Sequence, residues 1–528
     1  MRAPDQAPAL AAALAAPFTA VPDLIARHAE ARPEQPALVQ GDAVLTFGAL
    51  NAEADRVAAA LQRDGVRPRD VVAISGANSI AYAIVFVGAL RAGASVAPIP
   101  QSTAPAGLAA MIADSGATHA FVDADVRRAL APHREALRAR IVALDGGAED
   151  TSLERWLGTG AARPRPVDVE PDWPFNVIYS SGTTGTPKGI VQPHAMRWTH
   201  VQRGSTYGYG PSAVTLISTP LHSNTTLVSF FPALALGGTV ILMAKFDAGR
   251  YLALAERHRV THTMLVPVQY QRLLAHPAFD RHDLSSFQAK FCTSAPFTVP
   301  LKEEVLRRWP GGLIEFYGMT EGGGTCVLLA HEHRAKLHTV GRPAPGHDIR
   351  VIDEAGRELP RGALGEIVGH SPGMMTGYHG RPDATAAAEW FDAQGRRYIR
   401  TGDVGRFDDE GFVVLMDRRK DMIISGGFNV YPSDLEAVLR EHPGVMEAAV
   451  VGVPSLQWGE TPVAFVVPAP HAALDAAALR DWANARLGKL QRLADVQTVE
   501  ALPRSHIGKV LKRELRAAYA ARLPSVKR

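Results

Sequence analysis

Hydrophobic and polar positions alternate along the first third of the chain in blocks that suit helices followed by buried strands. Apolar residues recur at helical spacing at Leu50, Ala54, Val57 and Leu61, and Gly65 and Pro68 follow them. The continuous apolar run at 71–74 then predicts a buried strand. Repeated alternation of this kind predicts an α/β protein in which helices cover a sheet.

The pattern changes in the second half of the chain. Further buried strands are predicted at 175–178, 215–217, 239–242 and 262–266. From about His338, short strands interrupted by Gly and Pro, at 349–352 and 365–368, predict a small β subdomain.

The last part of the chain has the pattern of a separate α+β domain. Ser433 and Glu436 have the spacing of a capping box at a helix start, and buried strands are predicted at 448–451 and 463–467. We expect an α/β body with two helix-covered sheets and a small β-barrel subdomain at 1–416, a hinge at 417–420, and a mobile α+β lid at 421–528.

Composition and charge narrow the classes of partner. The chain has 528 residues, of which 46% are hydrophobic and 21% charged, and a net charge of +3. No dense Lys/Arg cluster favours nucleic acid or an anionic membrane, so the expected ligand is a small molecule. Cys292 and Cys326 are far apart, which excludes a disulfide framework or a Cys-based zinc site and favours a cytoplasmic protein.

The alanine-rich run at 7–16 is weakly apolar and leads into a helical pattern, so we do not expect a secretion signal. No stretch approaches the roughly 18–20 apolar residues that a membrane span needs. The sequence leaves both a monomer and a homodimer open.

The segment Tyr179–Gly189, YSSGTTGTPKG, follows a predicted strand and is rich in glycine and hydroxyl groups. Such a loop can turn backbone N–H groups and hydroxyls toward one point and bind an anion such as polyphosphate. Lys188 is followed by Gly189 rather than Ser or Thr, so this is not a Walker A loop. A flexible surface linker is the alternative for this stretch alone.

Four more motifs follow in order: YGMTEGG at 317–323, YIRTGDVGRFDDEGF at 398–412, DRRKDMIISGGFNVYP at 417–432 and LPRSHIGKVLKREL at 502–515. Together with the loop, they resemble the adenylate-forming superfamily of acyl-CoA synthetases, luciferases and nonribosomal adenylation domains. The resemblance covers almost the whole chain. It implies that the protein activates a carboxylic acid with ATP and Mg²⁺ and then transfers the acyl group to coenzyme A.

The resemblance also implies the nucleotide site. Its catalytic residues would be Lys509, Thr320, Glu321 and Lys188, with Glu321 as the Mg²⁺ ligand. The phosphate loop would contribute Ser180, Ser181, Gly182, Thr183, Thr184 and Gly185, and the adenosine part would be held by Ser294, Ala295, Pro296, Tyr317, Gly318, Asp403 and Arg418. Thr293 and Ser294 replace glycines that the family has in its adenine-binding segment, which makes that part of the resemblance weaker.

Two half-reactions on one site require a movable lid. By resemblance, Lys509 bridges the substrate carboxylate and the nucleotide during adenylation, and Lys420 is the hinge about which the lid rotates. The implied coenzyme A contacts are Gly426, Gly427, Trp458 and Arg492. Trp458 has a structural alternative, packing between domains.

The resemblance places the acyl pocket at 222–226, 266–269 and 322–326. The residues predicted to line it are His222, Asn224, Val266, Gln269, Gly322, Gly323 and Gly324. None of these segments contains Lys or Arg, and we therefore expect an uncharged, bulky acid that is aromatic, alicyclic or medium-chain, rather than acetate or a dicarboxylate.

Three other functions share some of these features. An adenylating enzyme could transfer the acyl group to an amine or to a carrier protein instead of coenzyme A. A nucleotide-binding sensor without catalysis is disfavoured by the joint presence of Lys188, Glu321, Asp403 and Lys509. A luciferase-like oxygenase would share every motif, and nothing in the sequence specifically supports it.

Overall fold

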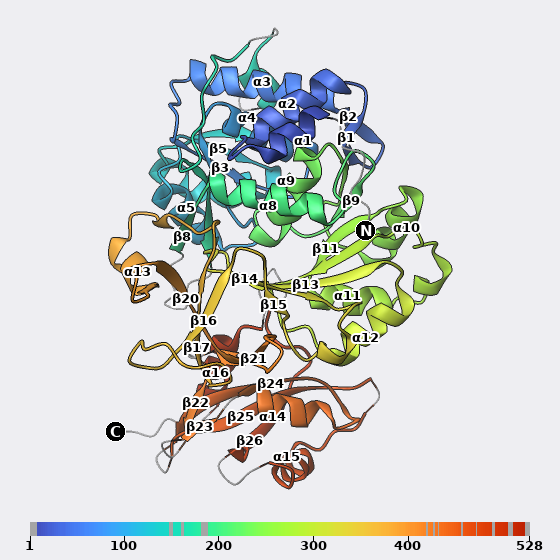
Figure 1. Cartoon of the computed structure of the whole chain (residues 1–528), viewed down its shortest axis with the longest axis vertical. Coiled ribbons are helices and arrows are strands. Elements are labelled where there is room, and N and C mark those ends of the chain that lie inside the picture. The colour runs from blue at the N-terminus through green and yellow to red at the C-terminus, as the bar shows by residue number, and fades with distance from the viewer. Residues whose placement is uncertain are drawn as a thin grey trace. The chain divides into compact units, whose positions relative to one another are not determined.

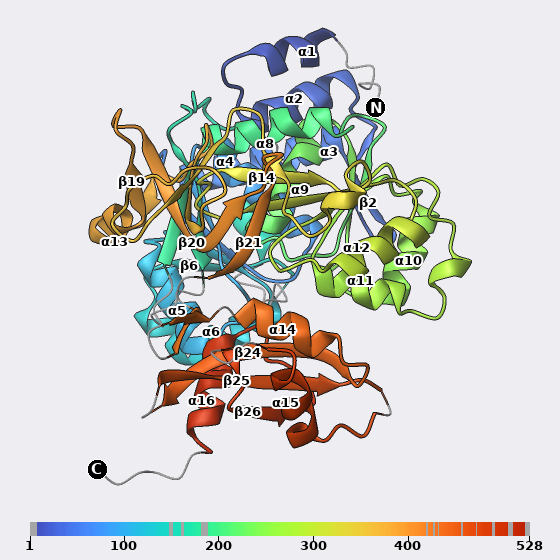
Figure 2. The same cartoon turned by 60° about the horizontal axis from the view of Figure 1, so that its bottom comes forward.

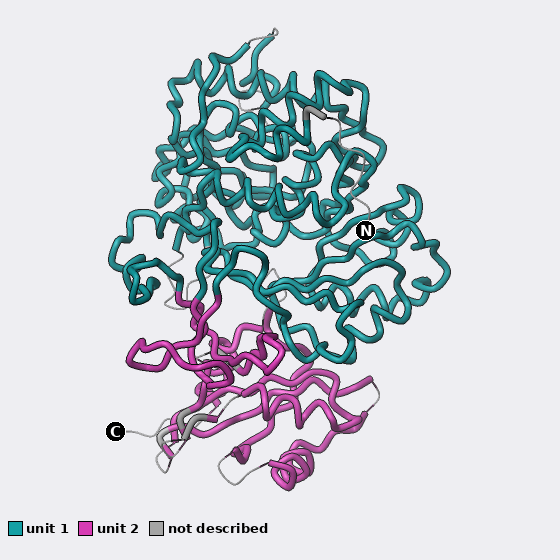
Figure 3. The backbone as a smooth tube through the Cα atoms, viewed as in Figure 1, with its two compact units in different colours: residues 1–348, 369–399 teal, residues 349–368, 400–528 magenta. Residues whose placement is uncertain are grey.

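The computed structural model describes residues 8–146, 152–159, 163–180, 188–418, 421–425, 428–430, 432–455, 458–470, 472–487, 491–504 and 510–522. The chain forms two compact units, coloured separately in Figure 3. The first unit consists of residues 1–348 and 369–399, and the second of residues 349–368 and 400–528.

Two large, mainly parallel sheets form the first unit (Figure 1). Sheet A contains, in spatial order, β15 (Arg342–Pro343), β14 (Thr325–Leu329), β13 (Gly312–Gly318), β12 (Ala289–Cys292), β11 (His262–Leu265), β9 (Val214–Ile217), β10 (Thr239–Leu242), β1 (Pro36–Gln40) and β2 (Ala43–Thr46). Sheet B contains β18 (Gly377–Tyr378), β8 (Lys188–Pro193), β7 (Pro174–Ser180), β4 (Ser95–Pro98), β3 (Val71–Ser75), β5 (His119–Val122) and β6 (Arg140–Ala143).

Helices cover both sheets. The described helices of this unit are α1 (Pro8–Ala15), α2 (Val21–Ala31), α3 (Phe47–Arg63), α4 (Ile80–Arg91), α5 (Pro105–Asp114), α6 (Ala124–Leu130), α7 (Leu153–Leu157), α8 (His194–Thr206), α9 (Asn224–Ala235), α10 (Ala248–Arg257), α11 (Pro267–Leu274), α12 (Val299–Arg308) and α13 (Pro382–Ala387), with 3-10 turns η1 (Ala131–Ala136), η3 (Phe279–Arg281) and η4 (Arg334–Lys336).

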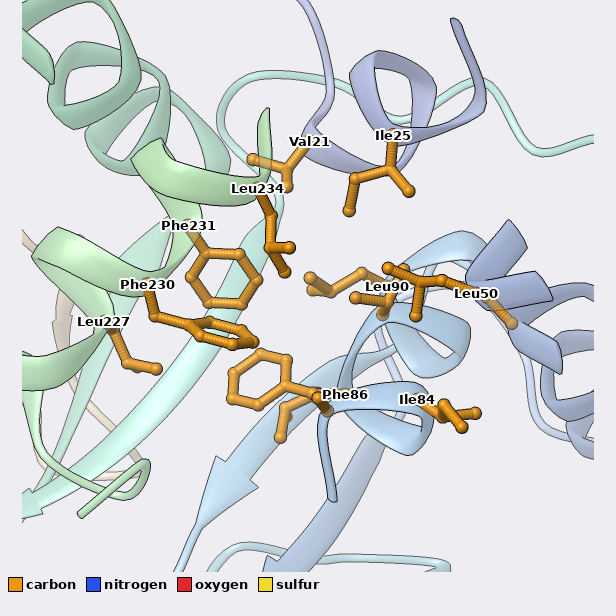
Figure 4. Packing of buried hydrophobic residues seen from close by; sticks show 14 of the residues in the cluster. Val21, Ile25, Leu50, Ile84, Phe86, Leu90, Leu227, Phe230, Phe231 and Leu234 are labelled. Carbon is orange, nitrogen blue, oxygen red and sulfur yellow. The ribbon is translucent and has the colours of Figure 1, made fainter. Parts of the chain in front are cut away.

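One hydrophobic cluster joins the two sheets through the helices between them. It takes buried residues from strands of both sheets and from α2, α3, α4, α8 and α9. In the part shown in Figure 4, the rings of Phe86 and Phe231 lie 5.1 Å apart between centroids, and Phe230 lies 5.1 Å from Phe231. Edge-to-face contacts of this kind add to the free energy gained by burying the rings.

A third, smaller sheet follows in the sequence. Sheet C contains β16 (Asp348–Ile352), β17 (Gly365–His370), β20 (Arg397–Phe407) and β19 (Glu389–Phe391) in spatial order, and β21 (Val413–Arg418) also pairs with β20. These are the short strands that the glycine and proline pattern predicts after His338.

The rest of the second unit is a sheet with helices on both faces (Figure 2). Sheet D contains β23 (Phe428–Val430), β22 (Ile423–Ser425), β25 (Gly459–Pro468) and β24 (Val445–Ser455), with β26 (Asp495–Thr498) also paired to β25. The helices are α14 (Pro432–Arg440), α15 (Ala476–Asn484) and α16 (Lys512–Ala520). Because side chains alternate along a strand, Val450 packs with α14 and α15 while Val451 packs with α16 on the opposite face.

The predicted α/β class, with a smaller C-terminal α+β part, is confirmed, and so are the predicted helix α3 and strand β3. The helix start predicted at Ser433 needs correction. The helix α14 begins at Pro432, so Ser433 lies inside its first turn and donates its hydroxyl to the carbonyl of Met416. The Glu436 carboxylate accepts the Val450 N–H of β24 2.9 Å away, and this tertiary contact replaces the local capping box that the spacing predicts.

Candidate functional site

The predicted phosphate loop joins two paired strands. β7 and β8 are antiparallel, with Ser180 opposite Lys188 and Tyr179 opposite Gly189. Strand structure therefore extends two residues further into each end of the motif than the sequence predicts. Ser181, Gly182, Thr183, Thr184 and Gly185 lie outside the described residues.

The end of β7 is held by an acidic contact. The Tyr179 hydroxyl donates to Oδ2 of Asp114 at 2.8 Å, and Arg381 donates to the other oxygen of Asp114 at 2.8 Å. Burial raises the pKa of Tyr179, and the Asp114 charge adds to the rise, so the phenol stays protonated. These contacts keep the strand that leads into the loop in place.

Lys188 and Glu321 meet at one tyrosine. The Lys188 ammonium lies 5.2 Å from the centroid of the Tyr378 ring, and the Tyr378 hydroxyl donates to Oε1 of Glu321 at 2.8 Å. Burial raises the pKa of Tyr378, and the Glu321 charge raises it further, so the hydroxyl remains a donor. The structure thus brings a cation to the ring face of Tyr378 and a carboxylate to its hydroxyl, and both groups are predicted to be catalytic.

Tyr378 lies there because β18 extends sheet B. Its residues Gly377 and Tyr378 pair with Val191 and Ile190 of β8, directly after Lys188 and Gly189. The Met375 N–H, just before β18, donates to the carbonyl of Glu321 at 2.8 Å. No motif in the sequence pointed to Tyr378, since its role follows from strand pairing between distant segments.

Substituting Tyr378→Phe is expected to lower acid-dependent exchange of labelled pyrophosphate into ATP by about 10-fold, since a hydrogen bond to a carboxylate is worth about 1.5 kcal/mol or more. Tyr519→Phe is the matched control, because the Tyr519 hydroxyl also donates to a carboxylate, Asp495, at 3.2 Å in the second unit. Equal exchange rates in both variants would show that Tyr378 does not orient Glu321.

The Thr320 carbonyl is hydrogen-bonded to a network of buried polar side chains. Gln192 donates its amide to the Thr320 carbonyl at 2.5 Å. The side chain of Gln192 also accepts a hydrogen bond from Arg197 of α8, a residue with no exposed surface. The fully buried Arg197 donates in addition to Asn176 at 2.9 Å and to Asn224 at 2.8 Å. Asn224 was predicted to line the acyl pocket, and the structure connects its side chain to this network.

The predicted adenine segment follows β12. Ser294 has a φ of 80°, in the left-handed region that a residue with a side chain rarely adopts. The family that this chain resembles has glycine at this position. Ser294 therefore keeps the backbone conformation that glycine favours, although it carries a side chain. Its hydroxyl lies 2.5 Å from that of Thr225. Tyr317 and Gly318 end β13 and pair with Cys326 and Thr325.

Ser294→Gly should be more stable than Ser294→Ala by about 1 kcal/mol, because glycine adopts a positive φ without steric cost whereas alanine keeps the strain. Both variants lose the hydroxyl contact with Thr225, so the difference between their unfolding midpoints isolates the backbone contribution. Identical midpoints would show that the backbone at Ser294 is not strained.

Asp403 and Arg418 face each other across two strands of the second unit. They are directly opposite in the antiparallel pairing of β20 with β21. Gly402, with φ of 70°, bends the chain before Asp403, and the Asp403 N–H donates to the Thr401 hydroxyl at 3.0 Å. The sequence also allowed Asp403 to be a plain turn residue, but it lies within a strand.

The predicted acyl-pocket residues differ in their surroundings. His222 is buried, and the Gln269 side chain accepts the Val266 N–H at 3.2 Å at the start of α11. A Cβ on Gly322 would lie 2.1 Å from the Gly373 carbonyl oxygen, and one on Gly323 would lie 2.4 Å from Cβ of Ile399. At these two positions the missing side chain permits close packing within the protein. The role of Gly322, Gly323 and Gly324 in forming an open wall stays a prediction.

The remaining predicted residues belong to the second unit. Lys509, Lys420, Gly426 and Gly427 lie outside the described residues. Trp458 is 45% exposed, and Arg492 is also exposed. An exposed indole is available to stack on a flat ligand.

Within the described part of the chain, no group of three or more His, Cys, Asp or Glu side chains could hold a metal ion. None of the described helices is long and apolar enough to cross a membrane.

Comparisons with known proteins place these features in a family. A family model described as AMP-binding enzyme matches residues 25–379, and one described as AMP-binding enzyme C-terminal domain matches residues 434–509. A feruloyl-CoA synthase of Amycolatopsis sp is 35% identical over 504 residues, which are 93% of this chain and 98% of that protein.

Solved structures of other proteins superimpose on nearly the full length of this chain. The ATP-bound MatB from Rhodopseudomonas palustris superimposes with a TM-score of 0.85 at 29% identity, covering 95% of this chain and 99% of that one. The amide bond synthetase McbA from Marinactinospora thermotolerans has a TM-score of 0.84 at 30% identity, covering 94% and 99%. The chain therefore belongs to the AMP-binding enzyme family, within the adenylate-forming superfamily of acyl-CoA ligases.

Proposed function

We propose that this enzyme activates an uncharged, bulky carboxylic acid with ATP and transfers the acyl group to coenzyme A. In the first half-reaction a carboxylate oxygen attacks the α-phosphorus of ATP, and pyrophosphate leaves. In the second, the thiol of coenzyme A attacks the carbonyl carbon of the acyl-adenylate, a thioester forms, and AMP leaves.

The observation that carries this proposal is the convergence of Lys188, Tyr378 and Glu321 beside the end of the phosphate loop. Transfer to an α-phosphate requires positive charge near the leaving pyrophosphate and a carboxylate that can hold a divalent cation. Lys188 and Glu321 have these charges, and Tyr378 contacts both. Thr320, directly before Glu321, has its carbonyl held by Gln192.

Each predicted residue has a role in the proposed mechanism. Lys188 binds the β- and γ-phosphates together with Thr183 and Thr184, and Thr320 contacts the α-phosphate. Glu321 offers Mg²⁺ a hard carboxylate oxygen, the ligand type that this ion prefers. The ion, when bound, would neutralise charge on the phosphate oxygens.

The adenosine part is assigned to the remaining residues of the predicted nucleotide site. Asp403 would accept hydrogen bonds from the ribose hydroxyls, and its cross-strand neighbour Arg418 would contact ribose or phosphate. The backbone at Ser294 to Pro296 and the Tyr317 ring would enclose the adenine. Because the strained φ of Ser294 retains a glycine-like backbone, the substitution does not argue against this role.

The lid would serve the two half-reactions in turn. Lys509 bridges the acid and the nucleotide in adenylation, and rotation about Lys420 then brings Gly426 and Gly427 to the path of the thiol. Trp458 and Arg492 would contact the adenine and a phosphate of coenzyme A. Their exposure supports this assignment, since a binding residue must be reachable in the free protein.

The acid class rests on the predicted pocket segments and on one relative. These segments carry no Lys or Arg, and the 35% identical relative is named for an aromatic acyl-CoA product. A panel of acids in a pyrophosphate-release assay tests this assignment. Best turnover of acetate or malonate would reject the uncharged, bulky class.

An amine acceptor is the second candidate, because the 30% identical structural neighbour McbA is an amide bond synthetase. Incubating the protein with acid, ATP and Mg²⁺, and with either coenzyme A or an amine, separates the two by the mass of the product. Thioester formation supports the proposal, and amide formation without thioester would replace it. A carrier protein loaded in the same assay identifies the remaining alternative acceptor.

A further inference from the structure

One side of α8 carries three basic residues without an acidic partner. Arg197, His200 and Arg203 are spaced by three residues, so they follow one another along the helix surface. Among the described residues, no Asp or Glu forms a hydrogen bond or ion pair with any of them. Burial of a cation without a counter-charge is costly, which makes the arrangement unusual.

Amide oxygens accept the hydrogen bonds of the Arg197 guanidinium, whereas the Arg203 guanidinium has no such acceptor among the described residues. Arg197 is satisfied by Asn176, Gln192 and Asn224. The Arg203 guanidinium carbon lies 4.9 Å from the centroid of the Phe316 ring in β13, and none of the described residues accepts a hydrogen bond from this guanidinium. The side chain is half-buried, and burial lowers the pKa of Arg203.

Two histidines near Arg203 have the same ring nitrogen occupied. His347 Nδ1 accepts the Thr325 N–H at 2.9 Å, and His200 Nδ1 lies 3.4 Å from a guanidinium nitrogen of Arg197. A backbone amide and a guanidinium can only donate, so Nδ1 is the acceptor in both rings. Burial, helped by the Arg203 charge, lowers the pKa of His200 and brings that of His347 to about 4. Both rings are therefore neutral at pH 7, with their proton on Nε2.

The three side chains act on one another. His200 and Arg203 are three residues apart on α8, and Arg203 lies over Phe316 of β13. Phe316 pairs with Val327 of β14, two residues after Thr325, whose N–H is bound by His347, so the strand register brings His347 to the same region. Their outward groups are the Arg203 guanidinium and two Nε2–H groups, all of them donors. In the described part of the chain these donors have no acceptor, and all three residues are half-buried, so solvent or a small ligand can reach them.

The cluster lies beyond the reacting end of the site. Gln192 contacts both the Thr320 carbonyl and Arg197, near the first turn of α8. Arg203 is six residues further along this helix, a rise of about 9 Å. On the facing strand, Phe316 precedes the YGMTEGG motif in β13. An acyl group with its carboxylate near Thr320 would have to extend along α8 to reach Arg203.

We propose that Arg203, His200 and His347 form a distal-oxygen site, which binds an acceptor oxygen at the end of the acid remote from the carboxylate that is adenylated. The inference rests on the proposed function, because it requires an acyl group in this position. It narrows the substrate class to acids that carry a second oxygen function. Within the uncharged class this acceptor is a hydroxyl. A second carboxylate shares the chemistry, and a preference for it in the experiment would support the distal-oxygen site but reject the uncharged class.

The test compares cinnamate, 4-hydroxycinnamate and 4-carboxycinnamate as substrates in ATP-pyrophosphate exchange. The wild-type enzyme should prefer one or both oxygenated acids to cinnamate. Arg203→Met keeps a side chain of similar length over Phe316 and removes the donors. It should lower kcat/KM for the preferred oxygenated acid by about 10- to 100-fold, the range expected for a hydrogen bond to a charged group. Its activity on cinnamate should stay unchanged, which also shows that the variant is folded.

Two further variants isolate the cause. Arg203→Lys should retain part of the preference, and more of it for the carboxylate than for the hydroxyl, because a lysine ammonium keeps the charge but not the planar donor geometry. Thr206→Ala, at an exposed position of the same helix, should behave as wild type. An equal loss on all three acids, no preference in the wild type, or turnover only of acids without a second oxygen would overturn the inference. Absence of exchange with every acid would instead contradict the proposed function.

Discussion

Replacing Lys509 by alanine is expected to lower acid-dependent exchange of labelled pyrophosphate into ATP by about 100- to 1000-fold, the range observed when one positioned electrostatic contact to a transition state is removed. In the proposed mechanism, the Lys509 ammonium binds the attacking carboxylate and the nucleotide together. No other residue is assigned this task. Loss of the ammonium should therefore slow the attack on the α-phosphate directly.

Measuring the second half-reaction alone distinguishes loss of the Lys509 contact in adenylation from a general loss of folding or activity. When synthetic acyl-adenylate and coenzyme A are supplied, Lys509→Ala should form thioester at close to the wild-type rate, because the proposed mechanism places attack of the thiol after rotation of the lid. Lys512→Ala is the matched control, since the Lys512 ammonium is paired with Glu436 at 2.9 Å. Undiminished exchange in Lys509→Ala would contradict the mechanism.

Replacing Arg197 by methionine is expected to destabilise the protein by about 1–3 kcal/mol, the usual cost of leaving a buried hydrogen-bond acceptor without its donor. Arg197 has no exposed surface and donates to the side-chain oxygens of Asn176, Gln192 and Asn224. Burial lowers its pKa to about 9, so it is still charged at neutral pH. The methionine removes both hydrogen bonds that Arg197 donates to the buried Asn176 oxygen, while the Gln192 oxygen keeps the Asn176 amide at 2.9 Å and the Asn224 oxygen keeps the Gln192 amide at 3.3 Å.

Urea unfolding at pH 7 measures this effect. Arg128→Met is the control, because Arg128 and Asp125 form an ion pair with side chains 78% and 82% exposed, and such pairs contribute little. Arg197→Lys should remain clearly destabilised, since one ammonium cannot bridge three acceptors in the geometry of a guanidinium. A loss of less than about 1 kcal/mol in Arg197→Met would show that the network relaxes or admits water.

The same network connects stability to the site. Gln192 is held by Arg197 and donates to the Thr320 carbonyl, so a variant that folds should also bind ATP less well. The fold and the nucleotide site are therefore supported by the same buried side chains.

The local pattern of the sequence was enough to predict α3, β3 and the strand that precedes the phosphate loop. Helical spacing at Leu50 to Leu61 and the apolar run at 71–74 are short-range features, and burial of one face determines the structure they form. Strands β24 and β25 of sheet D were predicted for the same reason. The capping box at Ser433 was wrong because a distant strand binds Glu436, a contact that spacing along the chain does not reveal.

The sequence by itself determined the family and the chemical types in the site, because five ordered motifs carry them. Only the tertiary structure showed that Tyr378 joins Lys188 to Glu321, since β18 reaches that position by pairing with β8. Likewise, Lys and Arg are absent from the predicted pocket segments, yet folding brings Arg203 of α8 against Phe316 of β13. Charge in a site depends on which segments pack together in space, and this packing is decided by long-range burial rather than by neighbours in the sequence.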